Sequence, residues 1–325
     1  METRLDRVEV NRSIARRRRG PNPLLLREWL TALAFLAPQL IGLVVFILGP
    51  LVVTFYYTFI HWDFISPSRF VGLANWRYFF QDPRIGIVLF NTLKFIVMGT
   101  TSFLVFSLLL SLLINRPRRG IGLFRAIFFM PWVLSALAVG TAWRWMFNSQ
   151  SGPFAQLFGL FGAQSPDWLL DANVAMLAIA IMTTWQGLGY GLTIFLAGLQ
   201  GVPDHLHEAA QIDGANTWNR FRFITLPMLS PTILFLSVTS LIGAFQLFDP
   251  VVAMSSSTAT ISGAGGPNDS TRTIVLYLFN QLFEYSETVS GAGYGAVIAW
   301  MLALLILGVT ALQLVLSRWL VFYGD

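Results

Sequence analysis

The sequence predicts an all-α integral membrane protein with six membrane-spanning helices. Its 325 residues are 55% hydrophobic and only 11% charged, whereas soluble domains carry about 25% charged residues. The hydrophobic residues gather in six long runs, and these runs are continuous rather than alternating, which argues against the strands of a membrane barrel. The same composition excludes a typical soluble enzyme, a disordered chain and a disulfide scaffold.

Each predicted span is long enough for a bilayer core, which needs ~20 apolar residues in a helix. The six runs cover residues 31–59, 88–114, 123–147, 174–200, 233–255 and 296–322. The first run is too long for a cleaved signal peptide, and no small-residue cleavage site follows it. We therefore divide the chain into a basic tail, residues 1–30, and a transmembrane domain, residues 31–325.

The basic residues predict the orientation, because Lys and Arg are enriched in cytoplasmic loops. With the tail in the cytoplasm, 15 of the 21 basic residues fall in inside segments and five in outside segments. This arrangement places both ends of the chain in the cytoplasm. The Arg run at residues 16–19 is then an orientation signal close to anionic lipid headgroups. It lacks the aromatic pattern of a nucleic-acid site, so we expect lipid and not nucleic acid as its neighbour.

The sequence offers no cluster for catalysis or metal binding. It has no cysteine, which excludes thiol catalysis, disulfides and thiolate metal sites. The three histidines, His61, His205 and His207, lie in loops. The phosphate-binding pattern G-x-x-x-x-G-K-[ST] does not occur, so this chain is not expected to hydrolyse ATP. We expect no catalytic residue, no metal and no cofactor on the chain itself.

Two outer connections carry helical signals. Residues 154–161 can form a short amphipathic helix in the membrane interface, and residues 273–283 regain helical periodicity after a long polar loop. Loops of that length are more often functional than idle.

The inner connection between spans four and five predicts a helix–turn–helix. Asp204 can cap the free N–H groups of a first helix, and Gly214 can take the left-handed conformation that ends it. Asn216 or Thr217 can cap a second helix, which should stop before Pro227. By position alone this loop could equally be a plain surface connection.

The spacing within this loop, residues 201–227, resembles the EAA motif of permease subunits of binding-protein-dependent ABC importers. The residues that carry the resemblance are Glu208, Ala209, Ala210, Gly214, Ile224, Leu226 and Pro227. They lie in the loop and on the side of the membrane that the resemblance requires. The fold implied is the six-helix ABC importer permease fold, with the first helix of the loop as a cytoplasmic coupling helix.

Further segments resemble the carbohydrate-type permeases, the maltose and glycerol-phosphate group. These segments are residues 70–76, 129–152, 245–249, 265–267 and 293–296. The chain departs from that group by a lengthened stretch at about residues 255–264, rich in Ser, Thr, Ala and Gly. Some members of the family have eight spans, whereas six are found here.

The resemblance implies partners for this chain. A cytoplasmic ABC ATPase dimer would bind ATP and seat the coupling helix in a groove. A second permease subunit, favoured to be a paralogue, would form the other half of the path, and an extracytoplasmic solute-binding protein would deliver the solute. The location implied is a prokaryotic inner membrane.

Polar residues inside spans are candidates for the solute path, because an ionisable residue there costs roughly 2.5–3.5 kcal/mol on insertion scales. The candidates are Asn91, Gln186, Tyr190, Gln246, Asp249 and Trp300. Amides and carboxylates hydrogen-bond sugar hydroxyls, and aromatic rings stack on sugar faces. For each residue, helix packing is an equally good interpretation.

Alternative functions remain open at this point. The same type of importer could carry glycerol phosphate or another small solute such as a polyamine or a peptide. A stand-alone secondary transporter would need coupling charges or inverted repeats, and a membrane-embedded enzyme would need a catalytic cluster. The sequence shows neither convincingly.

Overall fold

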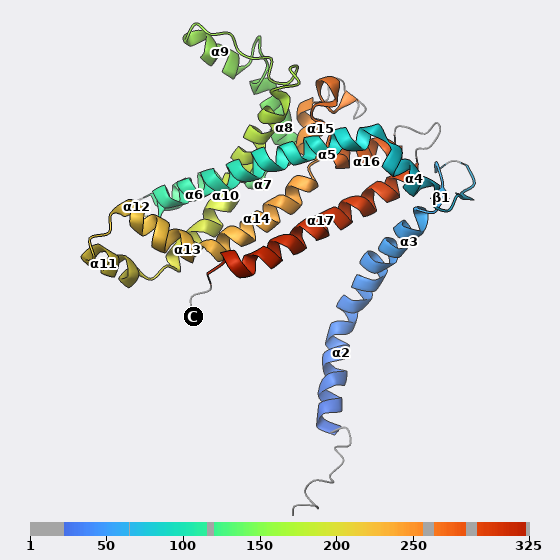
Figure 1. Cartoon of the computed structure of the whole chain (residues 1–325), viewed down its shortest axis with the longest axis horizontal. Helices are drawn as coiled ribbons and strands as arrows, with labels where there is room; N and C mark the ends of the chain where they lie inside the picture. The colour runs from blue at the N-terminus through green and yellow to red at the C-terminus, as the bar shows by residue number, and fades with distance from the viewer. Residues whose placement is uncertain (1–22, 65, 116–119, 256–262, 284–290, 323–325) are drawn as a thin grey trace, which may run out of the picture. The chain divides into compact units, whose positions relative to one another are not determined.

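The computed structural model describes residues 23–64, 66–115, 120–255, 263–283 and 291–322 (Figure 1). This part is helical apart from its loops and one antiparallel pair of short strands, β1 (Ile60–His61) and β2 (Arg69–Phe70). The chain divides into two compact units, residues 1–56 and 57–325. The Arg run at residues 16–19 and most of the lengthened stretch at 255–264 lie outside the described residues.

The described part of the first unit belongs to one long apolar helix. The helix α2 (Pro23–Leu43), a π turn (Val44–Leu48) and α3 (Gly49–Tyr57) follow one another without a break. Between residues 27 and 57 no side chain is buried. A helix that is apolar on all sides and has the length to cross a membrane suits lipid rather than water.

The second unit is a bundle of membrane-length helices with shorter helices at its two ends. Its helices are α4 (Ala74–Gln81), α5 (Pro83–Phe95), α6 (Thr101–Ile114), α7 (Ile121–Val133), α8 (Ala136–Met146), α9 (Pro153–Leu160), α10 (Ala175–Gln200), α11 (Asp204–Ile212), α12 (Thr217–Arg220), α13 (Leu226–Met228), α14 (Ser230–Phe245), α15 (Asp249–Ser255), α16 (Ile274–Phe283) and α17 (Ala292–Leu320). Short π turns join α5 to α6 and α12 to α13, and a 3-10 turn (Pro267–Asp269) precedes α16.

The predicted all-α membrane fold is confirmed, and six is the approximate number of spans. Among the described residues, four helices are long and apolar enough to cross a membrane. Two bent pairs add two spans if each pair is counted as one: α7 with α8, bent by 99°, and residues 217–228 with α14, bent by 63°. The expected helices at 154–161 and 273–283 are confirmed as α9 and α16.

Two predicted continuous spans are in fact broken. The span at 123–147 breaks at Leu134 and Ser135, three residues after Pro131, and Ser135 has an extended ψ of 129°. The span at 233–255 ends as a helix at Phe245, and α15 starts at Asp249. Pro250 explains the second break, because it has no N–H to continue the helix and its ring would clash with the preceding turn.

The helix α10 lies at the centre of the second unit, where α6 and α7 pack against it. The close approach of α6 and α7 to α10 depends on two glycines of α10. A Cβ on Gly189 would lie 2.2 Å from the Phe128 carbonyl oxygen on α7, and a Cβ on Gly191 would lie 2.3 Å from Ser107 Oγ on α6. Small residues at such contacts are the usual basis of helix packing in membranes.

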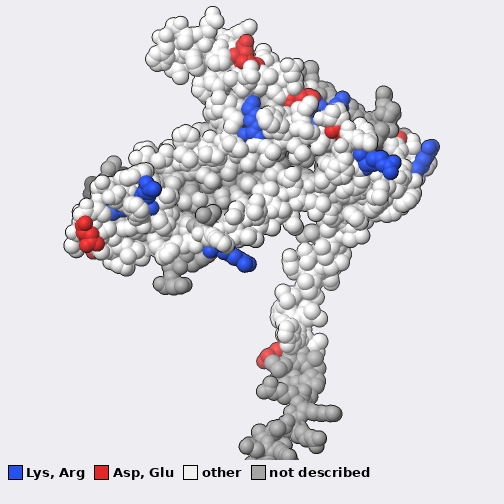
Figure 2. Space-filling view, viewed as in Figure 1, with Lys and Arg blue, Asp and Glu red and all other residues white. Residues whose placement is uncertain are grey.

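The two ends of this bundle differ in structure (Figure 1). One end, called here the α11 end, carries α11, α12, α13 and the C-terminal end of α17. The other end, called the far end, carries β1, α4, α9, α15 and α16. Figure 2 shows Lys, Arg, Asp and Glu gathered near these ends, with uncharged surface between them. This distribution suits a bundle that spans a bilayer.

A buried carboxylate ties the far end together. Asp82 is 7% exposed, and its Oδ2 accepts hydrogen bonds from the hydroxyls of Tyr277 and Tyr294, the latter at 2.6 Å. Its Oδ1 accepts from the Arg84 N–H at 2.9 Å, which caps α5. Burial, and then the bond to Asp82, raises the pKa of Tyr277, so this hydroxyl stays a donor.

Candidate functional site: an exposed helix and a central cavity

The helix α11 projects from the bundle and buries no side chain of its own. Glu208 and Ala209 are exposed, Ala210 is half-buried, and Ile212 is 87% exposed. A nine-residue helix is marginal in water by itself. An exposed Ile on such a helix, beside two alanines, makes a surface on which another protein could pack closely.

The start of α11 corrects one prediction. The sequence predicts Asp204 as a cap, but Pro203 occupies the capping position and no side chain bonds the free N–H groups there. Asp204 is instead the first helical residue. Its negative charge still favours that end of the helix through the helix dipole.

The turn after α11 has the predicted form. Gly214 adopts a left-handed φ of +82°, and the Ala215 N–H donates to the Ala210 carbonyl at 2.8 Å. Asn216 then caps α12 by accepting from the Asn219 N–H at 2.8 Å. A Cβ on Gly214 would meet nothing within 4 Å. The glycine is therefore required within this chain for its φ and not for space.

The sequence predicts that the second helix of the loop stops before Pro227. The helix continues past this residue to Met228. A π turn (Phe221–Thr225) comes first, in which the Leu226 N–H donates to the Phe221 carbonyl. The wider turn accommodates the ring of Pro227, and the sharp bend follows at Leu229. Ile224, Leu226 and Pro227 are half-buried, so this half of the motif-like segment belongs to the bundle.

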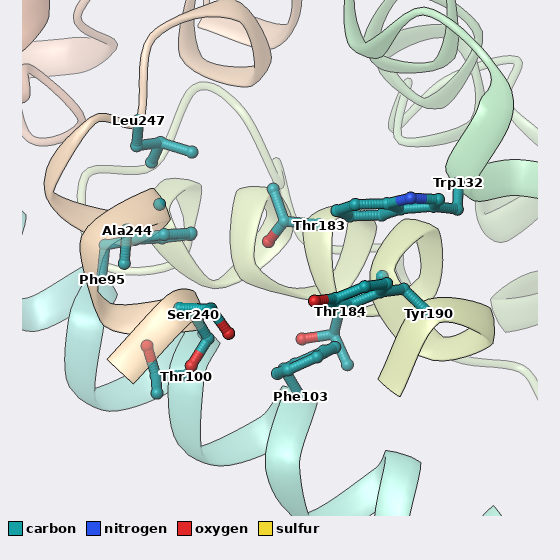
Figure 3. Close-up of a pocket in the computed structure, with 14 residues that line it drawn as sticks. Phe95, Thr100, Phe103, Trp132, Thr183, Thr184, Tyr190, Ser240, Ala244 and Leu247 are labelled. Atoms are coloured by element: carbon teal, nitrogen blue, oxygen red, sulfur yellow. The ribbon is translucent and has the colours of Figure 1, made fainter. Parts of the chain in front are cut away.

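A cavity of about 340 Å³ lies between α5, α6, α7, α10 and α14 (Figure 3). The described residues that line it are all uncharged. They are Phe95, Gly99, Thr100, Phe103, Trp132, Thr183, Thr184, Gly187, Tyr190, Thr239, Ser240, Gly243, Ala244 and Leu247. The cavity therefore combines aromatic rings with hydroxyl groups inside an otherwise apolar bundle.

The rings of Trp132 and Tyr190 form one wall of the cavity. They are stacked, with centroids 4.8 Å apart and planes at 16°, and Figure 3 shows the hydroxyls of Thr100 and Ser240 on the other side. The hydroxyl oxygens of Thr100 and Thr184 are buried without a hydrogen-bond partner in the described structure. Such orphaned groups are rare, because each costs about 1–3 kcal/mol.

Of the predicted path residues, Tyr190 lines the cavity and the others lie elsewhere. Asn91 is buried and donates to the carbonyls of Asp269 and Arg272, which holds the loop before α16. Gln186 donates to the Leu134 carbonyl at 3.1 Å. Gln246 and Asp249 are exposed at the break between α14 and α15, and Trp300 is half-buried in α17.

The sequence did not point to Trp132, Thr100, Thr184 or Ser240. A Trp at a helix end is common near membrane interfaces, and a hydroxyl in a span usually bonds back to its own helix. Only the three-dimensional arrangement separates the two unpartnered hydroxyls from the rest.

A helical bundle with broken spans, an exposed helix at one end and an internal cavity is typical of a membrane transport component. The chain belongs to the family of binding-protein-dependent transport system inner membrane components, which it matches over residues 104–321. This membership confirms the predicted fold and class.

Individual relatives agree with the family. A lactose transport system permease protein from Rhizobium radiobacter is 34% identical over 252 residues, which are 77% of this chain and 82% of that protein. An sn-glycerol-3-phosphate transport system permease protein from Agrobacterium fabrum is 33% identical over 289 residues, 89% of this chain and 94% of that protein.

The fold is also that of a solved transporter. The crystal structure of a bacterial alginate ABC transporter in complex with an alginate pentasaccharide-bound periplasmic protein contains a chain that superposes with a TM-score of 0.77. The two chains are 19% identical, and the match covers 93% of this chain and 98% of that one. At this identity the likeness concerns the fold.

Proposed function

We propose that this chain is one permease half of an ATP-driven importer for a sugar or an oligosaccharide. The observation that carries the proposal is the central cavity, with its stacked aromatic pair and its unpartnered hydroxyls. Sugars present hydroxyl groups that donate and accept hydrogen bonds, and apolar ring faces that pack on aromatic rings. The similarity to a lactose permease supports the same class of solute.

The second candidate is import of glycerol phosphate, which the 33% identical relative favours. A phosphate group in a membrane cavity calls for Arg or Lys, since Arg pairs with it through two hydrogen bonds. None of the described residues that line the cavity is charged. The cavity therefore favours an uncharged solute.

The energy for transport would come from a separate cytoplasmic ATPase dimer that binds ATP. The exposed helix α11, with Glu208, Ala209 and Ala210, would dock on this ATPase. Gly214 would form the turn, and Ile224, Leu226 and Pro227 would pass motion into α14. Closure of the ATPase pair would then switch the bundle between two states by rigid-body movement.

The remaining parts of the proposal concern the assembly. A second permease, favoured to be a paralogue, would complete the solute path, and an extracytoplasmic solute-binding protein would deliver the solute to the far end. The location would be a prokaryotic inner membrane, with the α11 end and both ends of the chain in the cytoplasm. The count of basic residues supports this orientation.

Co-purification tests the assembly. The tagged chain is extracted from its native membrane in mild detergent, and its partners are identified by mass spectrometry. We expect an ATPase subunit and a second permease, with the ATPase lost or weakened in Glu208→Lys and in Gly214→Asp. The matched control is Glu28→Lys, the same charge change on an exposed residue of α2. Recovery of the chain alone would contradict the proposal.

Uptake tests the solute. Membrane vesicles that contain the assembly, ATP and the solute-binding protein are given labelled mono- and oligosaccharides and, in parallel, labelled glycerol 3-phosphate. We expect ATP-dependent uptake of a saccharide. Uptake of glycerol 3-phosphate alone would favour the second candidate. Normal uptake by Glu208→Lys would remove the coupling role of α11.

A further inference from the structure

A second hollow, of about 310 Å³, lies at the far end of the bundle, where α8 ends beside α15. Its described lining comes from the end of α8 and the segment after it, from a turn before α10 and from the end of α15. These residues are Arg144, Phe147, Asn148, Ser149, Asp167, Trp168, Leu169, Leu170, Met254 and Ser255. The lining differs from that of the central cavity because it includes a cation and an anion.

Two oppositely charged side chains line this hollow, and among the described residues neither is part of an ion pair. Arg144 is half-buried in the last turn of α8, and Asp167 is exposed. Among the described residues, neither side chain makes an ion pair or a hydrogen bond. The helix dipole favours a cation where Arg144 lies. It does not supply hydrogen-bond acceptors for the five N–H donors of the guanidinium group.

The indole of Trp168, one of the two aromatic side chains that line this hollow, is held rigidly. The Trp168 Nε1 donates to Ser165 Oγ at 3.2 Å, and the indole packs on Phe147 with centroids 5.2 Å apart and on Phe158 at 6.3 Å. A fixed ring needs little ordering when a ligand arrives, which favours binding.

Asn148 adds a preoriented donor. Its Oδ1 accepts from the N–H groups of Gln150 at 3.0 Å and Ser151 at 2.9 Å, and from the Ser151 hydroxyl at 3.1 Å. The oxygen is thereby occupied, and the amide nitrogen is left with unused N–H donors within the described part of the chain.

From this set of groups we infer that the far-end hollow is an additional sugar-binding site. Arg144 and Asn148 donate to sugar hydroxyls, Asp167 accepts from them, and Trp168 presents an aromatic surface. The carboxylate disfavours a phosphate or another anion, and a single carboxylate is a poor metal site. Small-molecule sites occupy ~300–1,000 Å³, so this hollow is at the small end and takes one sugar unit. The inference rests on the proposed function, since it places a first contact for the imported solute at the end that receives it.

Cysteine protection tests the site, because the chain has no cysteine of its own. Ser149→Cys places a unique thiol in the lining, and Ala163→Cys places one on an exposed residue outside it. Right-side-out membrane vesicles, washed free of solute-binding protein, are treated with a membrane-impermeant thiol reagent. We expect the transported saccharide to slow the labelling of Ser149→Cys several-fold and to leave that of Ala163→Cys unchanged. Arg144→Gln, added to Ser149→Cys, should abolish the protection.

The outcomes separate this inference from the function on which it rests. Uptake of the saccharide by the unsubstituted chain, together with unprotected labelling of Ser149→Cys, would overturn the far-end site and leave the proposed function standing. Full protection in the presence of Arg144→Gln would also overturn the assignment. Absence of saccharide uptake by the unsubstituted chain would overturn both.

Discussion

At the scale of single residues, the hydroxyl groups around the central cavity fall into two kinds. Thr183, Thr239 and Ser240 donate to carbonyls of their own helices at distances from 2.9 to 3.2 Å. The hydroxyls of Thr100 and Thr184 have no partner in the described structure. The first kind is satisfied by its own helix, whereas the second has a hydrogen-bonding capacity that the described structure leaves unused.

Thr184→Val tests this distinction, because it removes the hydroxyl and keeps the shape. Loss of an unpaired buried hydroxyl should leave the melting temperature of the assembly in detergent unchanged or raised. Saccharide uptake should fall, since a hydrogen bond to the solute is lost. Thr193→Val is the control on the same helix, since the Thr193 hydroxyl bonds the Gly189 carbonyl at 2.8 Å and lies outside the cavity lining. Wild-type uptake by Thr184→Val would contradict the prediction.

Of the residues that line the cavity, sequence reasoning at this scale pointed to Tyr190. It selected residues by polarity, and polarity in a span has several causes. The polar side chain of Asn91 serves to hold a loop. From the sequence, Thr184 cannot be told apart from the many threonines whose hydroxyls bond their own helix. The buried trio of Asp82, Tyr277 and Tyr294 was missed because its members are far apart in the sequence.

At the scale of helices, the bends were the features hardest to predict. Proline marks each of them: Pro131 precedes the break between α7 and α8, Pro227 the bend into α14, and Pro250 the start of α15. A proline indicates a possible break in a helix, but the point at which the helix resumes depends on the neighbouring groups that bond the freed backbone. In this chain the break near Pro131 is stabilised from outside its own helix.

Gln186 provides that stabilisation. Its Nε2 donates at 3.1 Å to the carbonyl of Leu134, where α7 has ended. Inside a membrane an unsatisfied carbonyl is costly because no water is available to it. The sequence could suggest Gln186 as a polar residue in a span, but only the bend of 99° makes it a partner for this carbonyl.

Gln186→Met should therefore destabilise the break between α7 and α8. Loss of one hydrogen bond that leaves a carbonyl unpaired costs about 1–3 kcal/mol, so the melting temperature of the assembly in detergent should fall. Gln186→Glu, with a neutral protonated carboxyl, can still donate and should retain more stability at low pH. The control is Gln156→Met, which makes the same change at an exposed amide of α9. Equal melting temperatures for Gln186→Met and the control would contradict this role.

At the scale of the whole molecule, composition and spacing were sufficient for the class of protein. The apolar runs reflect the lipid environment directly, so the number and rough limits of the spans could be predicted. The motif-like segment in the inner loop could be predicted because its turn depends on local residues such as Gly214 and Asn216. The cavity and the far-end hollow could not, since each is built from segments that meet only in the folded bundle.

The orientation of the bundle is the last prediction, and the absence of native cysteine makes it accessible to experiment. Single cysteines are placed at the exposed residues Ala163, between α9 and α10, and Asn219 in α12. In intact cells a membrane-impermeant thiol reagent should label Ala163→Cys, because the far end is predicted to face outside. Asn219→Cys should be labelled only after the membrane is opened, since 15 of the 21 basic residues assign the α11 end to the cytoplasm. The reverse pattern would place α11 out of reach of a cytoplasmic ATPase, and the proposed coupling through Glu208 would fail with it.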